Sequence, residues 1–211
     1  MKNILIISVH PDDETLGCGG TILKHKQSGD KVYCFLVTNG NSKQSKLIKK
    51  LQELYDIVFI QGNLPEITLD DLSLSEIIPV FSNVFNMVKP HTIYLPNRFD
   101  VHSDHRKAFE ASQACLKTFR YPFLKRVLMM EIISETDFAP ALPENHFIPN
   151  VFIDVSEFMN EKMKIMEIFE SELLDYPQTR SINTIKAYHR YRGSQINVEF
   201  AECFMLIKEI L

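Results

Sequence analysis

The sequence predicts a single α/β domain, residues 1–211, built on a mostly parallel sheet. Short apolar runs such as residues 4–7 and 32–37 are typical of strands buried on both faces. Longer segments with helical spacing or helix-capping residues follow several of these runs, which is the alternation that parallel sheets need. The chain has 211 residues, of which 45% are hydrophobic, so one domain with a sizeable core can form.

The elements follow one another in a regular order. Strands are predicted at residues 4–7, 32–37, 57–60, 92–95, 126–131 and 150–155. Helices are predicted at residues 15–27, 45–55, 73–89, 106–119, 157–173 and 182–192, the third opened by a Ser73–Glu76 capping box and the last closed by Gly193 as a C-cap. Residues 201–210 indicate an edge strand or a short helix, and residues 135–149, with three prolines, a long loop that could act as a flap.

Composition argues against several classes of function, although a local basic patch stays open. The net charge is −4 without a basic run, so a nucleic-acid partner is not indicated. An apolar segment of about 18 residues, which a membrane span needs, does not occur, and the first apolar run is too short for a signal peptide. The four cysteines form no C-x-x-C pair, which favours reduced thiols in a cytoplasmic protein. The sequence leaves the oligomeric state open, a homo-oligomer included.

The glycines near residue 17 do not form a dinucleotide-binding fingerprint. Gly17 and Gly19 would require a third glycine at position 22, which is isoleucine. The next strand ends in Thr38 and Asn39 instead of an acid for a ribose. We therefore expect Gly17, Gly19 and Gly20 to serve close packing or the close approach of a ligand.

A first polar cluster follows the first strand directly. His10, Asp12, Asp13 and Glu14 stand where that strand ends, with Pro11 stiffening the turn. Ligands bind at this edge of open α/β sheets, and a cation there would offset the repulsion among three acids. The alternative is a solvated helix start, in which the acids are stabilised by the helix dipole.

A second polar cluster follows the strand at residues 92–95. It contains Asp100, His102, Asp104 and His105. Because parallel strands place their carboxyl ends at one edge, both clusters are predicted to meet there. The alternative for this cluster alone is a polar loop with a helix cap.

Together the clusters supply the groups that hydrolysis of an amide requires. We select His10, Asp13 and His105 as a two-nitrogen, one-oxygen metal site, which suits catalytic Zn²⁺ and also Fe²⁺. Asp12 could accept a proton from water. His102, if protonated, could stabilise an oxyanion and protonate the leaving amine. Asp104 could orient one of the histidines, and we group it with Asp12 and His102 as catalytic.

The motifs resemble those of a known family of deacetylases. His10-Pro11-Asp12-Asp13-Glu14 with His102-x-Asp104-His105 is similar to the N-acetylglucosaminyl-phosphatidylinositol de-N-acetylase family, also called PIG-L or LmbE-like. Thr38-Asn39-Gly40, residues 149–156, Arg192-Gly193 and residues 201–204 resemble further elements of that family. The resemblance implies a Rossmann-like, three-layer fold and a zinc-dependent deacetylase, with metal at His10, Asp13 and His105, the base at Asp12 and the oxyanion-stabilising group at His102.

The expected function is removal of an N-acetyl group from an amino-sugar conjugate of the N-acetylglucosamine type. The substrate would be a small soluble molecule, such as a glycan precursor or a nucleotide sugar. Arg98, as a forked donor to a phosphate or carboxylate, and Asn39, in a loop at the same edge, are the candidates for substrate binding. Two alternatives stay open: the same site acting on a non-sugar amide, and a non-catalytic binding module that has kept the fold.

Overall fold

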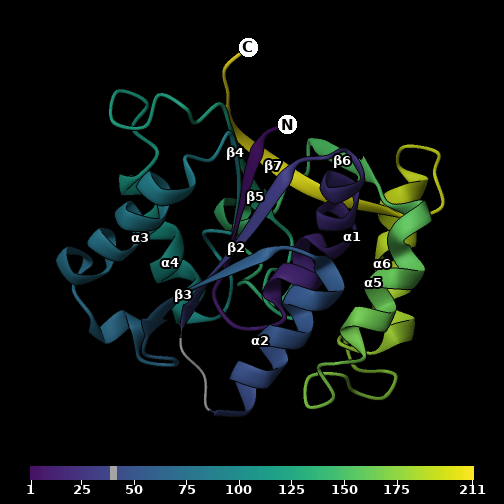
Figure 1. The fold of residues 1–211 in the computed structure, drawn as a ribbon. Coiled ribbons are helices and arrows are strands. Elements are labelled where there is room, and N and C mark those ends of the chain that lie inside the picture. Colours follow the sequence, from purple (N-terminus) through teal and green to yellow (C-terminus); the bar gives the residue numbers. More distant parts are fainter. Residues whose placement is uncertain (39–41) are drawn as a thin grey trace.

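The chain folds into one seven-stranded sheet with helices on both faces (Figure 1). The computed structural model describes residues 1–38 and 42–211, without the side chains of 42–44. The strand order is β3-β2-β1-β4-β5-β7-β6, in which the β5–β7 and β6–β7 pairs are antiparallel and the other pairs are parallel. The strands are β1 (Asn3–Ser8), β2 (Lys31–Thr38), β3 (Val58–Leu64), β4 (Thr92–Leu95), β5 (Arg126–Met130), β6 (Val151–Asp154) and β7 (Ala201–Glu209).

Six α-helices and three short 3₁₀ turns are described. The helices are α1 (Asp13–Gln27), α2 (Ser42–Tyr55), α3 (Leu74–Val88), α4 (Ser103–Ala114), α5 (Met159–Met166) and α6 (Ile182–Ser194). The 3₁₀ turns are Leu69–Asp71, Pro143–Asn145 and Ser156–Phe158. The Ser73–Glu76 capping box forms as predicted, and α3 continues through Pro79.

The side chains of the central strands are buried on both faces of the sheet, which explains why the sequence of such a strand is a continuous apolar run. In β1, Ile4 and Ile6 pack into the core beneath α1, α2 and α5, whereas Leu5 and Ile7 pack into the core beneath α3 and α4. Figure 1 shows α3 and α4 on one side of the sheet and α1, α2, α5 and α6 on the other. The predicted three-layer α/β fold with a mostly parallel sheet is therefore confirmed.

The strand order reverses between β1 and β4. The connection from β1 leads to β2 on one side, whereas β4 pairs with the opposite side of β1. In open α/β sheets, ligands bind at the carboxyl ends of the two strands that flank such a reversal. The two polar clusters follow β1 and β4, so the topology brings them to this point.

The glycines of α1 serve close packing. The helix is broken at Cys18, whose φ is −151°. A Cβ on Gly20 would lie 2.7 Å from the Cβ of Val155, closer than atoms can approach. Beyond the break, the Glu202 carboxylate accepts hydrogen bonds from the backbone N–H of Gly20 (2.8 Å) and of Thr21 (2.7 Å). This half of α1 is thus capped from β7.

Three predictions about the C-terminal third were wrong. Residues 201–209 form an interior strand between β5 and β6, because the neighbouring β6 takes the edge position. The helix predicted at 157–173 ends at Met166, where tighter turns lead the chain so that Phe169 enters the core. Gly193 lies inside α6 and does not cap it. A Cβ there would lie 2.7 Å from the carbonyl oxygen of Val198.

The cysteines and the hydrophobicity of the helices were also considered from the sequence. All four cysteines are free and buried, as predicted. Within the described residues, every helix is too short or too polar to cross a bilayer.

Candidate active site

Three side chains present their ligand atoms to one point at the carboxyl edge of β1 and β4. His105 Nε2 lies 3.2 Å from Asp13 Oδ2 and 3.3 Å from His10 Nδ1, and His10 Nδ1 lies 3.9 Å from Asp13 Oδ2. Bonds of about 2.0–2.1 Å around a tetrahedral Zn²⁺ would separate two ligand atoms by about 3.3 Å. The donor set that we selected from the sequence therefore fits a divalent metal ion.

The turn after β1 fixes Asp13 in place. The backbone N–H groups of Val9 and His10 both donate to Asp13 Oδ2, at 2.9 and 2.8 Å. Asp13 is the first residue of α1 and is almost fully buried. One oxygen of this carboxylate is thus held at the point where the histidines converge.

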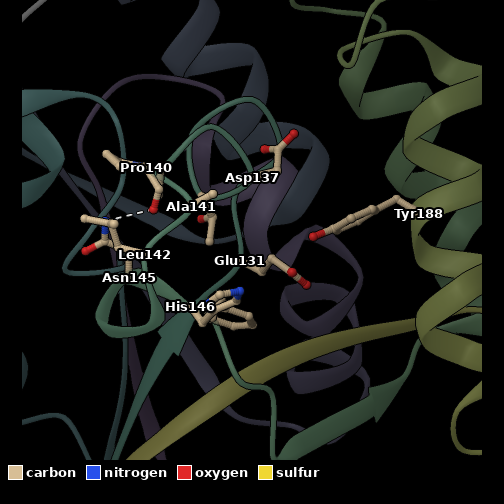
Figure 2. Close-up of a pocket in the computed structure, with 11 residues that line it drawn as sticks. Glu131, Asp137, Pro140, Ala141, Leu142, Asn145, His146 and Tyr188 are labelled. Atoms are coloured by element: carbon tan, nitrogen blue, oxygen red, sulfur yellow. Dashed lines mark hydrogen bonds between the residues drawn. The ribbon is translucent and has the colours of Figure 1, made fainter.

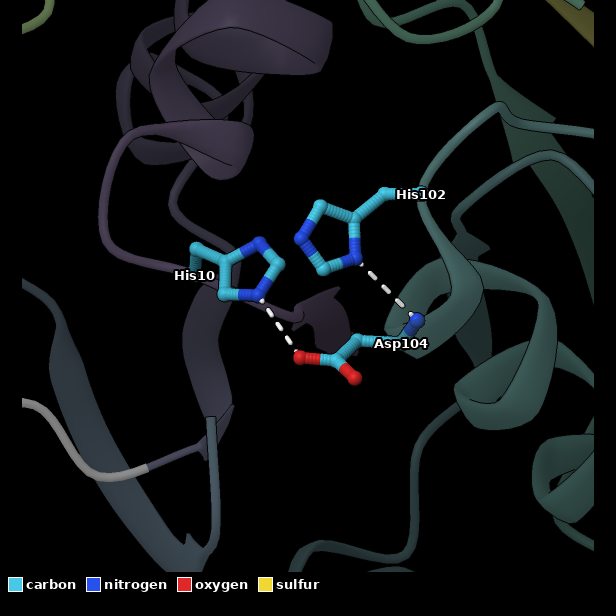
Figure 3. Close-up of side chains that lie close together, drawn as sticks. All are labelled: His10, His102 and Asp104. Atoms are coloured by element: carbon cyan, nitrogen blue, oxygen red, sulfur yellow. Dashed lines mark hydrogen bonds and ion pairs between the residues drawn. The ribbon is translucent and has the colours of Figure 1, made fainter. Parts of the chain in front are cut away.

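Carboxylates on the far sides of the two histidines set their tautomers. His105 Nδ1 lies 2.9 Å from Asp100 Oδ2, and Asp100 is itself bonded by the Thr136 hydroxyl. His10 Nε2 lies 3.1 Å from Asp104 Oδ2 (Figure 3). When these nitrogens donate their hydrogens to the carboxylates, His10 Nδ1 and His105 Nε2 keep free lone pairs for a metal.

The electrostatics of the cluster favour a positive charge. Burial raises the pKa of Asp13, but His105 and His10 more than reverse this effect and hold it below its usual value. Burial lowers the pKa of His105, yet Asp13 and Asp100 raise it well above its usual value. Carboxylates that stabilise a proton on His105 would equally stabilise a cation at its Nε2.

Asp12 lies beside the cluster in a strained conformation. Its φ of 132° is rare for a residue with a side chain, and the carboxyl is nearly buried. Arg180 Nη1 donates to Asp12 Oδ2 at 2.8 Å. Burial and the neighbouring Asp13 raise the pKa of Asp12 well above its usual value, although Arg180 acts in the opposite direction. A proton acceptor of raised pKa is therefore placed next to the candidate metal ligands.

The ring of His102 lies beside the ring of His10, and the two ring centroids are 4.5 Å apart. It is the N-cap of α4, and its Nδ1 accepts the backbone N–H of Asp104 at 3.1 Å (Figure 3). Burial and then His10 lower the pKa of His102, against the influence of Asp104. The neutral ring, with its hydrogen on Nε2, is thus favoured.

Asp104 does not act on His102 through its carboxylate. Its Oδ2 contacts His10 and accepts the backbone N–H of Ile67 at 2.8 Å, and its Oδ1 accepts that of Leu69 at 3.1 Å. His10, His102 and Asp104 also come close enough to be considered as a metal group. In that group, however, His102 Nδ1 and His10 Nε2 already hydrogen-bond to Asp104 itself. We therefore assign the metal to the group formed by His10, Asp13 and His105.

A cavity of about 310 Å³ opens beside these residues. Its wall includes His10, Asp12 and His102 from the two polar clusters. The remaining lining residues are Pro11, Glu66, Ile67, Glu135, Glu172 and Arg180. Ile67 has a φ of 69°, unusual for a β-branched residue, and the residue as a whole is 70% exposed.

Of the two residues predicted to bind substrate, Arg98 does not line this cavity. Arg98 lies over the ring of Phe99 in a separate hollow. Asn39 falls within residues 39–41, outside the described part of the chain.

A second cavity, of about 270 Å³, lies between residues 136–147 and Tyr188 of α6 (Figure 2). Glu131 in its wall is already bound by Arg192 Nε, at 3.0 Å, and by Cys203 Sγ, at 2.8 Å. The candidate metal groups of the described residues both include His10, which does not line this cavity. We therefore place the chemistry beside His10.

The comparisons with known proteins identify the family. Residues 5–116, just over half of the chain, match the family described as PIG-L, GlcNAc-PI de-N-acetylase. The chain belongs to the PIG-L family. The matched segment contains both polar clusters, so the resemblance seen in the sequence is confirmed.

Relatives of this PIG-L family member extend the similarity beyond residue 116. Diacetylchitobiose deacetylase of Thermococcus kodakarensis is 26% identical over 189 residues, which cover 82% of this chain and 70% of that protein. YaiS of Escherichia coli K12, described as an uncharacterized deacetylase, is 28% identical over 128 residues, 56% of this chain and 69% of YaiS. A conserved protein of Thermus thermophilus has the same fold, with a TM-score of 0.79, 21% identity, and 100% and 97% of the two chains covered.

Arg180, Glu135 and Asp100 are site residues to which sequence reasoning gave no role. Asp100 lies within the second cluster, and its spacing of five residues from His105 was a usable signal. Arg180 is 168 positions from Asp12, and its local sequence shows only a loop before the Ser181 N-cap. Glu135 was treated as the first residue of a flap, whereas it contacts both Arg180 and the backbone of His102.

Proposed function

We propose that this protein is a metal-dependent hydrolase that removes an N-acetyl group from an amino-sugar conjugate of the N-acetylglucosamine type. One observation carries the proposal: the candidate metal ligand His10, the proton acceptor Asp12 and the hydrogen-bond donor His102 line one cavity, and the other two candidate ligands, Asp13 and His105, converge on His10. Membership of a de-N-acetylase family and the name of the Thermococcus relative support it.

His10, Asp13 and His105 would hold the metal, because their donor atoms and separations suit Zn²⁺ and also Fe²⁺. Once bound, such an ion supplies Lewis-acid polarisation of an amide carbonyl and of a water molecule. Asp100 and Asp104 keep the two imidazoles in the orientation that this requires.

Asp12 moves the proton. Arg180 engages Asp12 Oδ2, which leaves Oδ1 to take a hydrogen from the attacking water. When the C–N bond breaks, the same oxygen returns the proton to the departing nitrogen, so that acetate and an amine are released. Burial raises the pKa of Asp12, which suits a carboxylate that must accept a proton and then return it.

His102 donates a hydrogen bond from Nε2 to the amide oxygen as negative charge develops there. Because its Nδ1 accepts the backbone N–H of Asp104, this histidine acts in its neutral form. We therefore assign proton delivery to Asp12 and charge stabilisation to His102, in place of the imidazolium considered from the sequence.

Release of acetate from N-acetylated sugars tests the proposal. Zn²⁺-loaded protein should release acetate and a primary amine, and a chelator should abolish the reaction. His105→Ala should lose metal binding measured by calorimetry, whereas His91→Ala, at the opposite end of β4, should retain it. Zn²⁺ binding without acetate release from any N-acetyl sugar would refute the proposed substrate class. Unchanged metal binding by His105→Ala would refute the site.

A further inference from the structure

The charges around the cavity indicate which substrates it admits. We propose that it selects N-acetyl amino-sugar conjugates that carry no acidic group, and that Glu66 and Glu172 enforce this selection. The inference rests on the proposed function and narrows it, because nucleotide sugars and sugar phosphates would be poor substrates.

Carboxylates dominate the wall. Asp12, Glu66, Glu135 and Glu172 line the cavity, and Arg180 is the one Lys or Arg that lines it among the side chains the structure describes. Glu66 is exposed at the rim, and 41% of the Glu172 side chain is exposed. A substrate that enters therefore meets two accessible negative charges.

Arg180 is not free to receive a phosphate or carboxylate. Its Nη1 donates to Asp12 and to Glu172, both at 2.8 Å, and its Nη2 lies 3.4 Å from Glu135. Only 16% of the side chain is exposed. The guanidinium that might have recognised an acidic group is thus committed to three carboxylates of the protein.

A bound metal ion would not reverse this balance. Asp13, Asp100 and Asp104 lie just behind the wall and add three carboxylates to the four that line it. Asp13 and His105 are buried and do not line the cavity, whereas Glu66 and Glu172 are accessible, so an entering phosphate meets these two carboxylates before it reaches the metal site. A substrate phosphate would therefore experience net repulsion near the rim.

Three further basic side chains of the described residues lie outside this cavity. Arg98, Arg106 and Lys107 line a separate hollow of about 380 Å³, shared with Asp70 and Glu110. Arg106 Nη1 is bound to the backbone carbonyl of Asp100, at 2.8 Å.

A neutral sugar conjugate suits the wall well. Its hydroxyl groups can donate hydrogen bonds to Glu66 and Glu172, and carboxylates are strong acceptors for such bonds. The exposed side chain of Ile67 offers an apolar surface to one face of a sugar ring. An ammonium group on the aglycone would gain further attraction from the same carboxylates.

Three N-acetylglucosamine derivatives that carry a neutral, a cationic or an anionic substituent at the anomeric position test the inference. They are the methyl glycoside, the 2-aminoethyl glycoside and the 1-phosphate, each assayed for acetate release by Zn²⁺-loaded protein. We expect kcat/KM to be highest for the aminoethyl glycoside and lowest for the phosphate, with at least roughly tenfold between them, the factor for about 1.4 kcal/mol. The ratio of kcat/KM for the aminoethyl glycoside to kcat/KM for the phosphate should fall as the salt concentration rises.

Variants assign the effect to particular side chains. Glu66→Gln and Glu172→Gln should each reduce the ratio by on the order of fivefold, the factor that about 1 kcal/mol of repulsion produces. Glu161→Gln removes an exposed carboxylate of α5 that does not line the cavity, and should leave the ratio unchanged.

The outcomes separate this inference from the proposed function. Release of acetate from all three derivatives at equal rates, or fastest from the phosphate, would overturn the inference and leave the deacetylase intact. A preserved ratio in both Glu66→Gln and Glu172→Gln would overturn the roles of these residues. Release from none of the three would overturn the proposed function and the inference with it.

Discussion

Replacement of Lys162 by methionine should strongly destabilise the fold. Lys162 and Glu202 are both completely buried, and their charged atoms lie 2.7 Å apart. Lys162 Nζ also donates to the backbone carbonyl of Leu16 at 2.9 Å and to His189 Nε2 at 2.6 Å. These bonds connect α5 to α1, α6 and β7.

The expected magnitude follows from what the substitution leaves behind. Methionine fills the volume, but Glu202 keeps its charge in the core and Leu16 loses a donor. Breaking one side of a buried ion pair costs about 3–5 kcal/mol in the free energy of unfolding. For a chain of this size, that corresponds to a fall in Tm of roughly 6–20 °C.

Urea unfolding followed by far-UV circular dichroism gives the measurement, since the chain contains no tryptophan. Lys164→Met, on an exposed position of the same helix, is the matched control and should change the free energy of unfolding by less than about 0.5 kcal/mol. A cost below about 1 kcal/mol for Lys162→Met would refute the reasoning.

A double variant separates the unpaired charge from lost packing. Glu202→Gln should destabilise the wild-type protein, because Lys162 then loses its counter-charge. In the Lys162→Met background the same change removes the stranded carboxylate, so it should add little or no further cost. Equal costs in the two backgrounds would show that the ion pair is not the source of the effect.

Three further predictions concern the site and the pH dependence of stability. Asp12→Asn should keep its metal and lose roughly 10²–10⁴-fold in kcat, because it removes the proton acceptor. Full activity at normal metal content would exclude that role. His102→Ala should change metal affinity little and lower kcat by about 10²–10³-fold. Loss of metal would make His102 a ligand instead. Burial and then Lys162 hold the pKa of His189 well below 6.5, so the unfolded chain takes up a proton there that the folded chain refuses. Stability should therefore fall as pH drops below about 6.5, and His189→Gln should reduce that slope by up to about 1.4 kcal/mol per pH unit in urea titrations. Parallel curves for the two proteins would contradict this assignment.

The fold and the core of the site were predictable because both depend on local sequence and on one topological rule. Apolar runs buried on both faces identify parallel strands, and parallel strands bring their carboxyl ends to one edge. His10, Asp13 and His105 could therefore be grouped although 95 positions separate the two histidines. To apply this rule about the shared edge of parallel strands, only the order of strands and helices along the chain has to be known.

What escaped prediction depends on long-range packing. Arg180, in the loop before α6, lines the cavity and reaches Asp12, and nothing in its neighbouring residues encodes that contact. The interior position of β7 depends on which strand takes the sheet edge, which periodicity does not specify. The carboxylate of Asp104 was free to orient either neighbouring histidine, and two backbone amides of the loop after β3 direct it to His10.

The contacts of Asp104 carry a consequence for how specificity can change in this protein. The loop that borders the cavity is anchored through the main-chain N–H groups of Ile67 and Leu69, so its attachment to His10 does not depend on the identity of most loop side chains. Glu66 and Ile67 can be exchanged to suit another substrate while the imidazole of His10 keeps its orientation. A proline at 67 or 69 would remove an anchoring N–H, so a library for redesign should omit proline at position 67 and keep Leu69, which is buried in the core.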